Sequence, residues 1–261
     1  MNPAAPGPGP HSTAAPPHGA PRLRWRNYRR AIYLVALVAG LIQLFILIPG
    51  EAREALFNAL HAQRALVFMM LLFAATALSL VWATGQRLDA RLFLAFNLRG
   101  RRVEWLDRSM WLVTHLGSFV TASLLAILLF VVNYRRLATE TVLGTLSLWL
   151  IVESIKSVTD RARPSHALEG ARVIGGHEPG RSFPSGHTAQ TFFLAVLMAH
   201  RFYVGLPMVI ALYLVAALVG LTRVYVGAHY PRDVLGGAVL GSVWGGLAAV
   251  VDPYWFRHWA R

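Results

Sequence analysis

Long apolar stretches are the feature that most constrains how this chain can fold. A helix needs about 20 apolar residues to cross roughly 30 Å of hydrocarbon. Because no water reaches the backbone there, such a stretch must satisfy its own hydrogen bonds, which favours helices over strands. The seven candidate stretches are residues 31–49, 65–84, 110–132, 139–156, 187–202, 204–222 and 234–251. The sequence therefore predicts an all-α polytopic membrane bundle of about six to seven transmembrane helices.

The charge content also favours a membrane protein. Charged residues make up 14% of the chain, against about 25% in typical soluble domains. The 25 Lys and Arg outnumber the 12 Asp and Glu, and the arginines cluster between apolar stretches. A nucleic-acid-binding protein would carry a basic face on a soluble fold, whereas this pattern suits anionic lipid neighbours. The chain has no cysteine, which excludes disulfides and cysteine-based metal sites.

The region before residue 110 divides into two parts. Residues 1–30 join a proline-rich, uncharged stretch to five closely spaced arginines, and predict a disordered tail followed by a basic juxtamembrane segment. Residues 31–109 hold the first two expected spans. In their last part, 85–109, arginines alternate with leucine and aromatic residues. That mixture favours an amphipathic segment in the membrane interface, although a plain basic loop fits nearly as well.

Three polar blocks at the ends of apolar stretches hold most of the informative polar residues. They read Lys156-x6-Arg163-Pro164, Pro184-Ser185-Gly186-His187 and Thr222-Arg223-x5-His229-x3-Asp233. Each block lies where an expected span begins or ends. We therefore expect the blocks to meet near one membrane surface and to form a single active site.

The first two blocks have the chemistry of an anion site. Lys156 as a point charge and Arg163 as a planar fork can hold one phosphate from different sides. Glu153, one turn before the lysine, can pair with it. The second block begins a helix, whose free N–H groups attract anions. Gly186 lets the backbone approach closely there, and Ser185 can add a hydroxyl donor. Alone, each block would also fit a helix end snorkelling to headgroups or an ordinary helix cap.

The third block supplies a reactive pair. Pro231 suits the first turn of the last helix, which places Asp233 in that turn and His229 just before it. Asp233 can then accept a hydrogen bond from one ring nitrogen of His229 and leave the other free as a nucleophile or base. Arg223 adds a second guanidinium. By itself the pair would also fit a purely structural His–Asp bond.

A metal site is a further alternative for the same residues. His187, His229 and Asp233 could in principle ligate zinc and leave one position open. The cations of the first and third blocks would repel a divalent ion and attract an anion. The sequence therefore predicts no metal.

Together, the three blocks resemble the signature of the type 2 phosphatidic acid phosphatase superfamily, which reads Lys-x6-Arg-Pro, Pro-Ser-Gly-His and Ser-Arg-x5-His-x3-Asp. The one departure is Thr222, where the signature has serine and threonine keeps the hydroxyl. The resemblance covers residues 110–251, which we interpret as a phosphatase core followed by a C-terminal tail at 252–261. The first two spans lie outside it.

The resemblance implies an integral membrane phosphatase that hydrolyses a lipid phosphate or diphosphate through a phosphohistidine, without metal or other cofactor. Carried over by position, His229 is the nucleophile, Asp233 orients it, and His187 protonates the leaving oxygen and then activates water. The residues implied to cradle the phosphoryl oxygens are Lys156, Arg163, Ser185, Gly186 and Arg223. The supporting positions are Glu153, Pro164, Pro184 and Thr222. Phosphoryl transfer needs such positioning and charge stabilisation more than covalent work.

The substrate remains open among phosphatidic acid, phosphatidylglycerol phosphate, polyprenyl diphosphate and lipid A phosphates. A lipid phosphotransferase with the same site would differ only in its acceptor. Vanadium-dependent haloperoxidases share the pocket, but they are soluble. A lipid transporter fits less well, because transporters place ionisable residues near the bilayer midplane, and here the span interiors are almost free of charge.

The side of the membrane is predicted differently by charge and by resemblance. Seven spans would put the N-terminal tail and the three blocks on one face. Outside the blocks, that face carries eleven arginines and the opposite face carries seven. Because the more positive face is usually cytoplasmic, this count favours a cytoplasmic site. The resemblance implies a site facing the periplasm or exterior of a bacterial plasma membrane, and we adopt that orientation. The expected partners are a lipid phosphate and the bilayer, and not nucleic acid.

Overall fold

The computed structural model describes residues 63–97, 103–202 and 205–257, with side chains up to 251, and scattered positions between 32 and 58. The expected tail at 1–30, most of the first expected span at 31–49 and the end of the C-terminal tail lie outside the described residues. Within the described ranges every regular element is a helix. The predicted all-α fold is therefore confirmed for this part of the chain.

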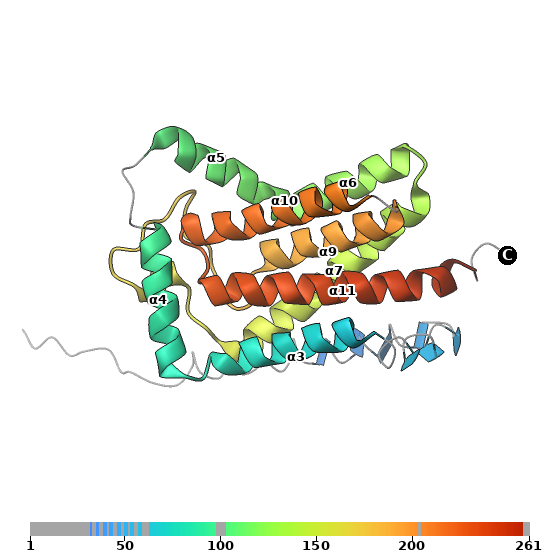
Figure 1. Ribbon diagram of the computed structural model, residues 1–261, viewed down its shortest axis with the longest axis horizontal. Coiled ribbons are helices and arrows are strands. Elements are labelled where there is room, and N and C mark those ends of the chain that lie inside the picture. Colours follow the sequence, from blue (N-terminus) through green and yellow to red (C-terminus); the bar gives the residue numbers. More distant parts are fainter. Residues whose placement is uncertain are drawn as a thin grey trace, which may run out of the picture.

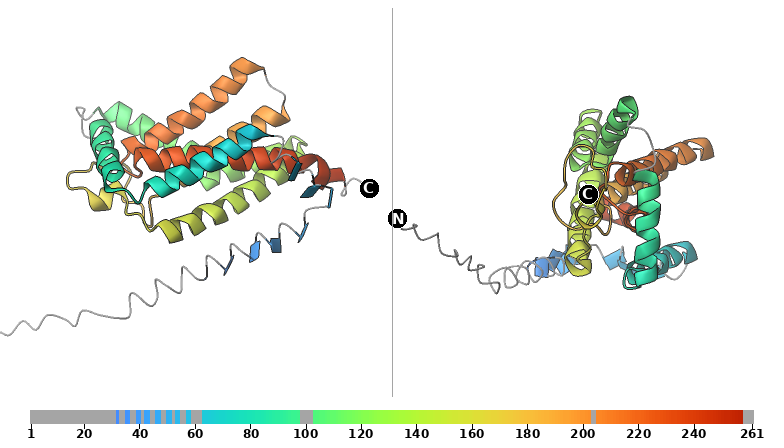
Figure 2. Two further views of the ribbon diagram at one scale, coloured as in Figure 1. Left: turned by 60° about the horizontal axis from the view of Figure 1, so that its bottom comes forward. Right: turned by 90° about the vertical axis from the view of Figure 1, so that its left-hand side faces the viewer.

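The described helices form an elongated bundle (Figure 1). They are α3 (Arg64–Ser79), α4 (Ala83–Asn97), α5 (Glu104–Thr114), the 3-10 turn η1 (His115–Gly117), α6 (Phe119–Val131), α7 (Arg135–Thr159), α8 (Pro164–Ala167), α9 (Gly186–Arg201), α10 (Leu206–Tyr225) and α11 (Pro231–Arg257). Helices α3, α9, α10 and α11 run along the bundle. Helix α4 stands across one end of it, in Figure 1 and in the left view of Figure 2.

Three described helices are long and apolar enough to cross a membrane, at Arg135–Ala167, Leu206–Tyr225 and Pro231–Val251. The count rises to five if two bent helix pairs each form one span. The expected stretch 187–202 became α9, which has only 16 residues. The predicted membrane bundle is confirmed, and the described part of the chain supplies three to five of its spans.

Both bent pairs correct the expected boundaries. The stretch expected at 65–84 ends at Ser79, and α4 then turns away from α3 by 95°. The stretch expected at 110–132 is broken at η1 by a bend of 57°. There the Ser118 hydroxyl accepts a bond from the backbone N of Thr121 at 3.1 Å and starts α6 afresh. A polar cap inside an apolar run therefore divides what hydropathy reads as one helix.

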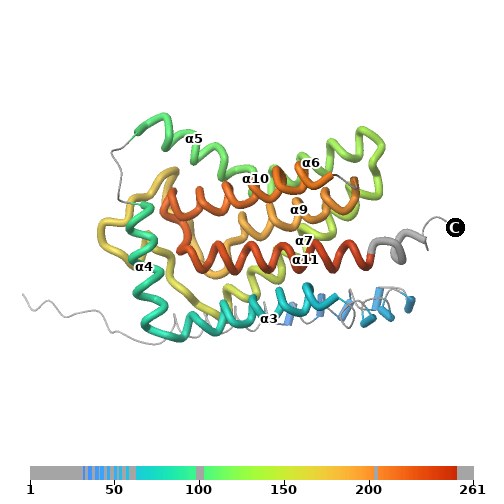
Figure 3. The backbone as a smooth tube through the Cα atoms, in the orientation of Figure 1, coloured from blue at the N-terminus to red at the C-terminus, as the bar shows by residue number. Residues whose placement is uncertain are grey.

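Helix α9 lies at the centre of the bundle and packs against α10 and α11 (Figure 3). Its contact with α11 depends on the glycine ridge of the last helix. A Cβ at Gly237 would come within 2.5 Å of the Ser185 oxygen, and one at Gly241 within 2.1 Å of the Ala189 oxygen. These distances exclude any side chain there. The small-residue ridge thus brings the two backbones together, as such ridges do in membrane helices.

Helix α4 is amphipathic in a more specific way than the sequence indicated. Asp89, Phe93 and Asn97, spaced by four residues, are buried against the bundle. Leu88 and Phe96 on the neighbouring face are exposed. This arrangement fits a helix that covers the end of the bundle and turns an apolar edge outward.

Candidate active site

The three polar blocks come together at the end of the bundle that α4 covers. Lys156 lies in the last turn of α7, and Arg163 is the N-cap of α8. Ser185 is the N-cap of α9, where its backbone N donates to the Asp233 backbone oxygen at 2.9 Å. His229 stands in the short loop before α11. Four helix ends therefore supply one polar region, as expected from the sequence.

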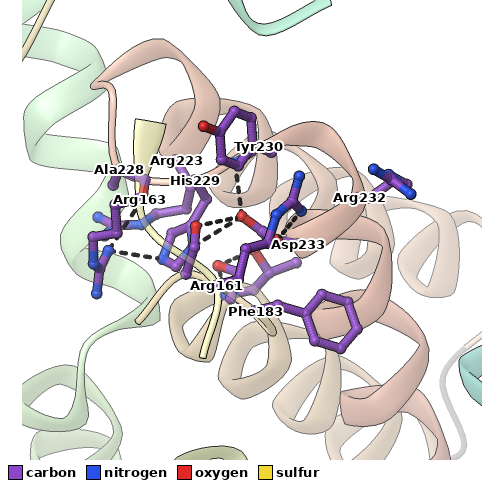
Figure 4. A network of polar contacts seen from close by, with 12 residues as sticks. Arg161, Arg163, Phe183, Arg223, Ala228, His229, Tyr230, Arg232 and Asp233 are labelled. Carbon is purple, nitrogen blue, oxygen red and sulfur yellow. Dashed lines mark hydrogen bonds and ion pairs between the residues drawn. The ribbon is translucent and has the colours of Figure 1, made fainter. Parts of the chain in front are cut away.

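His229 is the centre of this region, between Arg163 on one side and Asp233 on the other (Figure 4). Its side chain is only 2% exposed. Its Nε2 lies 3.2 Å from Arg163 Nη1. A guanidinium has no acceptor, so Nε2 must accept and the ring proton must sit on Nδ1. The imidazole thus directs a lone pair toward the arginines.

The surroundings of His229 favour the neutral ring. Burial, together with Arg163 and Arg223, lowers the pKa of His229 well below its usual value, while Glu178 acts in the opposite direction. A neutral imidazole can attack an electrophile, whereas an imidazolium cannot. The same arginines that would attract an anion therefore also keep this histidine reactive.

The direct bond expected between His229 and Asp233 is not formed. Nδ1 and the Asp233 Oδ2 are 3.8 Å apart, which is contact but too long for a hydrogen bond. The carboxylate is taken up by other donors: Arg161 Nη1 at 2.5 Å, Ser182 Oγ at 2.5 Å and the Tyr230 backbone N at 2.8 Å. Ser182 Oγ also lies 3.5 Å from Nδ1. The serine hydroxyl therefore contacts both members of the pair.

Two buried guanidinium groups converge on a single carboxylate. Glu178, in the loop before α9, receives Arg163 Nη1 on Oε2 at 2.9 Å and Arg223 Nη2 on Oε1. Arg223 also donates to the Thr114 hydroxyl at 2.9 Å. Burial would raise the pKa of Glu178, but the two arginines lower it to about 2. The arginines are thus spaced to grip one small anion.

The remaining predicted residues lie around this centre with different partners. Lys156 Nζ donates to Glu153 Oε1 at 2.7 Å. Ser185 Oγ accepts from the Thr188 hydroxyl at 2.9 Å and so serves the helix cap. Thr222 is fully buried, and its hydroxyl donates to the Val219 oxygen at 2.6 Å. The hydroxyl of Thr222 is therefore committed to its own helix.

Three further predicted positions are placed by the backbone around the site. Pro164 opens α8 directly after Arg163, and Pro184 precedes the α9 cap. His187 lies in the first turn of α9 beside the η1 bend, where a Cβ on Gly117 would come within 2.7 Å of its backbone oxygen. The η1 bend between α5 and α6 thus packs against the start of α9, where the second block lies.

Sequence reasoning missed several polar residues of this region. They are Asp89, Arg161, Glu178, Ser182 and Arg232. Arg161 stands two residues before Arg163, which could have marked it. Asp89 and Asn97 lie four residues before and after Phe93, on one helix face. That spacing could have indicated that these two polar residues are buried together with the phenylalanine. Nothing in the sequence pairs Glu178 with two distant arginines.

Comparison with known proteins identifies the family. A model of the PAP2 superfamily matches residues 137–257. Phosphatidylglycerophosphatase B of Bacillus subtilis is 33% identical over 154 residues, which cover 54% of this chain and 72% of that protein. This chain belongs to the PAP2 superfamily. The lipid A 1-phosphatase of Rhizobium johnstonii is 38% identical over 109 residues, or 39% of this chain and 42% of that protein.

A solved PAP2 structure has the same fold. The transmembrane phosphatidylglycerolphosphate phosphatase of Bacillus subtilis superposes with a TM-score of 0.62 at 28% identity, covering 70% of this chain and 93% of that one. By sequence, the chain spans only about two fifths of the lipid A 1-phosphatase it matches. The sequence matches and the solved structure thus establish the family and the membrane bundle. All three polar blocks lie inside the segment that the family model matches.

Proposed function

We propose that this PAP2 protein is an integral membrane phosphatase that releases phosphate from a lipid phosphate or diphosphate. The observation that carries the proposal is the convergence of Arg163 and Arg223 on one carboxylate beside the lone pair of a buried, neutral His229. Both arginines also have a buried Nε without a partner among the described residues. Each of the two guanidinium groups therefore keeps one N–H that no described residue accepts.

In the proposed reaction, Nε2 of His229 attacks phosphorus, and an N–P bond forms as the bond to the lipid oxygen breaks. Burial and Arg223 lower the pKa of His187 to about 3, so the negative charge of the bound phosphate must first favour the protonated form of this histidine, which then gives its proton to the leaving oxygen. His187 then takes a proton from water, whose oxygen attacks phosphorus as the N–P bond breaks, so that phosphate leaves and His229 returns to its neutral form. Lys156, Arg163 and Arg223, with Ser185 and the backbone at Gly186, stabilise the charge on the phosphoryl oxygens. Asp233 stabilises the Nδ1–H side of the ring, and no metal takes part.

The substrate class is supported by the relatives and by the position of the site. The two curated relatives act, by name, on phosphatidylglycerol phosphate and on lipid A. Here the site lies at helix ends, where a headgroup phosphate would lie while its chains stay in the bilayer. Phosphatidic acid and polyprenyl diphosphate fit the same geometry. Transfer to a second lipid is the alternative outcome, and transport remains the less favoured one.

We further propose that the protein resides in a bacterial plasma membrane with this site facing the periplasm or exterior. The orientation rests on the family resemblance. Reporter fusions in the loop after α6 and at the C-terminus test it, because a site on the outside places both fusion points on the cytoplasmic side.

The deciding experiment is phosphate release by a His229→Ala variant in detergent. We expect the wild type to release phosphate from one of these lipids in the presence of a chelator, and the variant to release none. His200→Ala is the matched control, because His200 lies in the last turn of α9 at the far end of the bundle. Near-wild-type release by His229→Ala would refute the assignment. Labelled phosphate found on lipid instead of in water would establish the transferase.

A further inference from the structure

Asp233 belongs to a buried cluster of four charged side chains, on the side of its carboxylate away from His229. The other three are Arg161, Asp89 and Arg232. Arg161 donates to Asp233 Oδ1 at 2.5 Å and, through Nη2, to Asp89 on α4. Asp89 also accepts from the backbone N and the Nε of Arg232, at 3.1 and 3.2 Å. The side chains of Asp233, Asp89 and Arg161 are 0%, 1% and 6% exposed. Two positive and two negative charges thus balance where an unpaired charge would be costly.

Helix α4 is held over this cluster by the rest of its buried face. One turn after Asp89, Phe93 packs edge-on against Tyr230, with 5.7 Å between the ring centroids. The guanidinium of Arg161 lies 4.2 Å from the centre of the same tyrosine ring. One turn further, the Asn97 amide donates to two backbone oxygens, each at 2.9 Å. Contacts on three successive turns therefore fix how deep α4 sits and which way it faces.

We propose that Asp89 is a positioning residue for the phosphoryl transfer and acts through Arg161 on Asp233. The inference rests on the proposed function, since it concerns the same reaction. Helix α4 lies before the segment that the family model matches, 137–257. A helix outside the segment that the family model matches would then be part of the working site, and the unit needed for activity would extend beyond the core expected at 110–251.

The physical reason is the charge that His229 must carry during the reaction. Once Nε2 is bonded to phosphorus and Nδ1 keeps its proton, the ring is cationic, and the Asp233 carboxylate 3.8 Å away stabilises it. Arg161 alone would neutralise that carboxylate. Because Asp89 neutralises Arg161 in turn, the charge of Asp233 stays available to the imidazole.

Asp89→Asn tests this because it keeps the side-chain shape and removes the charge. We expect kcat for a short-chain lipid phosphate to fall about tenfold, which equals a change of about one unit in the proton affinity of the imidazole. KM should stay unchanged, because Arg163 and Arg223 still hold the phosphate. Asp89→Glu, which keeps the charge, should retain more of the kcat.

The matched control is Asp107→Asn on the neighbouring helix α5. Asp107 also pairs with a guanidinium, that of Arg172 at 2.8 Å, and also ties an N-terminal helix to the loop before α9. Its partners are Arg172 and Tyr225 instead of Arg161. We expect its kcat to stay near the wild-type value. Thermal unfolding of each purified variant reports any general loosening.

Restoring the charge balance gives a second readout that a structural role would not produce. Asp89→Asn combined with Arg161→Gln leaves one positive and one negative charge, so the double variant should be faster than Asp89→Asn alone. Wild-type kcat in Asp89→Asn, equal losses in Asp89→Asn and Asp107→Asn, or a double variant slower than the single would each overturn the proposal. A wild-type protein inactive on every lipid phosphate would refute the proposed function instead.

Discussion

The two sides of His229 differ in how their charges are balanced. On the Nε2 side, two cations face one carboxylate: Arg163 and Arg223 against Glu178. On the Nδ1 side, two cations face two carboxylates: Arg161 and Arg232 against Asp89 and Asp233. The first side has a positive excess and an exposed carboxylate, so it can accept an anion. The second side is closed and neutral, so it can hold the ring without binding a ligand.

This contrast divides the expected effects of substitutions. Changes on the open side should alter how tightly phosphate is bound and how well its charge is stabilised. Changes on the closed side should alter kcat and leave KM alone. The following variants test that division, from the largest effect to the smallest.

Arg223→Gln should have the largest effect. Its side chain is 1% exposed and donates to both Glu178 and Thr114. Losing one fixed donor to the transition-state oxygens typically costs about 10²–10³ in rate, so we expect kcat/KM to fall by that order. Steady-state kinetics check it, with Arg181→Gln as the control, because Arg181 pairs with Asp160 at 2.5 Å outside the cradle. If kcat/KM fell no further in Arg223→Gln than in Arg181→Gln, Arg223 would not contact phosphate.

Ser182→Ala should lower kcat by about tenfold, the value of one hydrogen bond to a charged group. The Ser182 hydroxyl donates to Asp233 at 2.5 Å and touches Nδ1. Without it neither the carboxylate nor the Nδ1 side of the ring is held in place by the hydroxyl, while the phosphate cradle is untouched, so KM should not change. Ser157→Ala is the control, since that buried hydroxyl donates only within its helix, to Ser154. A change confined to KM would show that Ser182 acts on phosphate binding and not on the Nδ1 side of His229.

Glu178→Gln should have the smallest effect and the opposite sign. The carboxylate occupies both arginines and is 37% exposed. Removing its charge should therefore favour an incoming phosphate, but solvent screening limits the gain to about fivefold in KM. Competition by orthovanadate, a phosphate mimic, measures the same change, and the exposed Glu169 supplies the Glu→Gln control. Weaker binding would show that Glu178 holds the arginines in place instead of competing with phosphate.

The sequence predicted the open side better than the closed one. Lys156, Arg163, Arg223 and His229 stand in short blocks at fixed spacings, so the family signature could be read from them, while the apolar stretches indicated the fold class. Asp89 lies 72 residues from Arg161, and long-range pairs of this kind leave no local pattern. Hydropathy also missed the breaks after Ser79 and at η1, because apolar content does not show where a helix bends or where a cap such as Ser118 starts a new one. The prediction of a direct His229–Asp233 hydrogen bond was wrong, because other donors bind the Asp233 carboxylate.

The central claim is that Nε2 of His229, facing the arginines, is the atom that accepts the phosphoryl group. Rapid quenching with base after mixing with a lipid carrying labelled terminal phosphate, followed by peptide mapping, tests it directly. Phosphohistidine is stable in base and labile in acid, so we predict acid-labile label on the peptide that contains His229. Label on His187, or acid-stable label on a serine or threonine, would contradict the account.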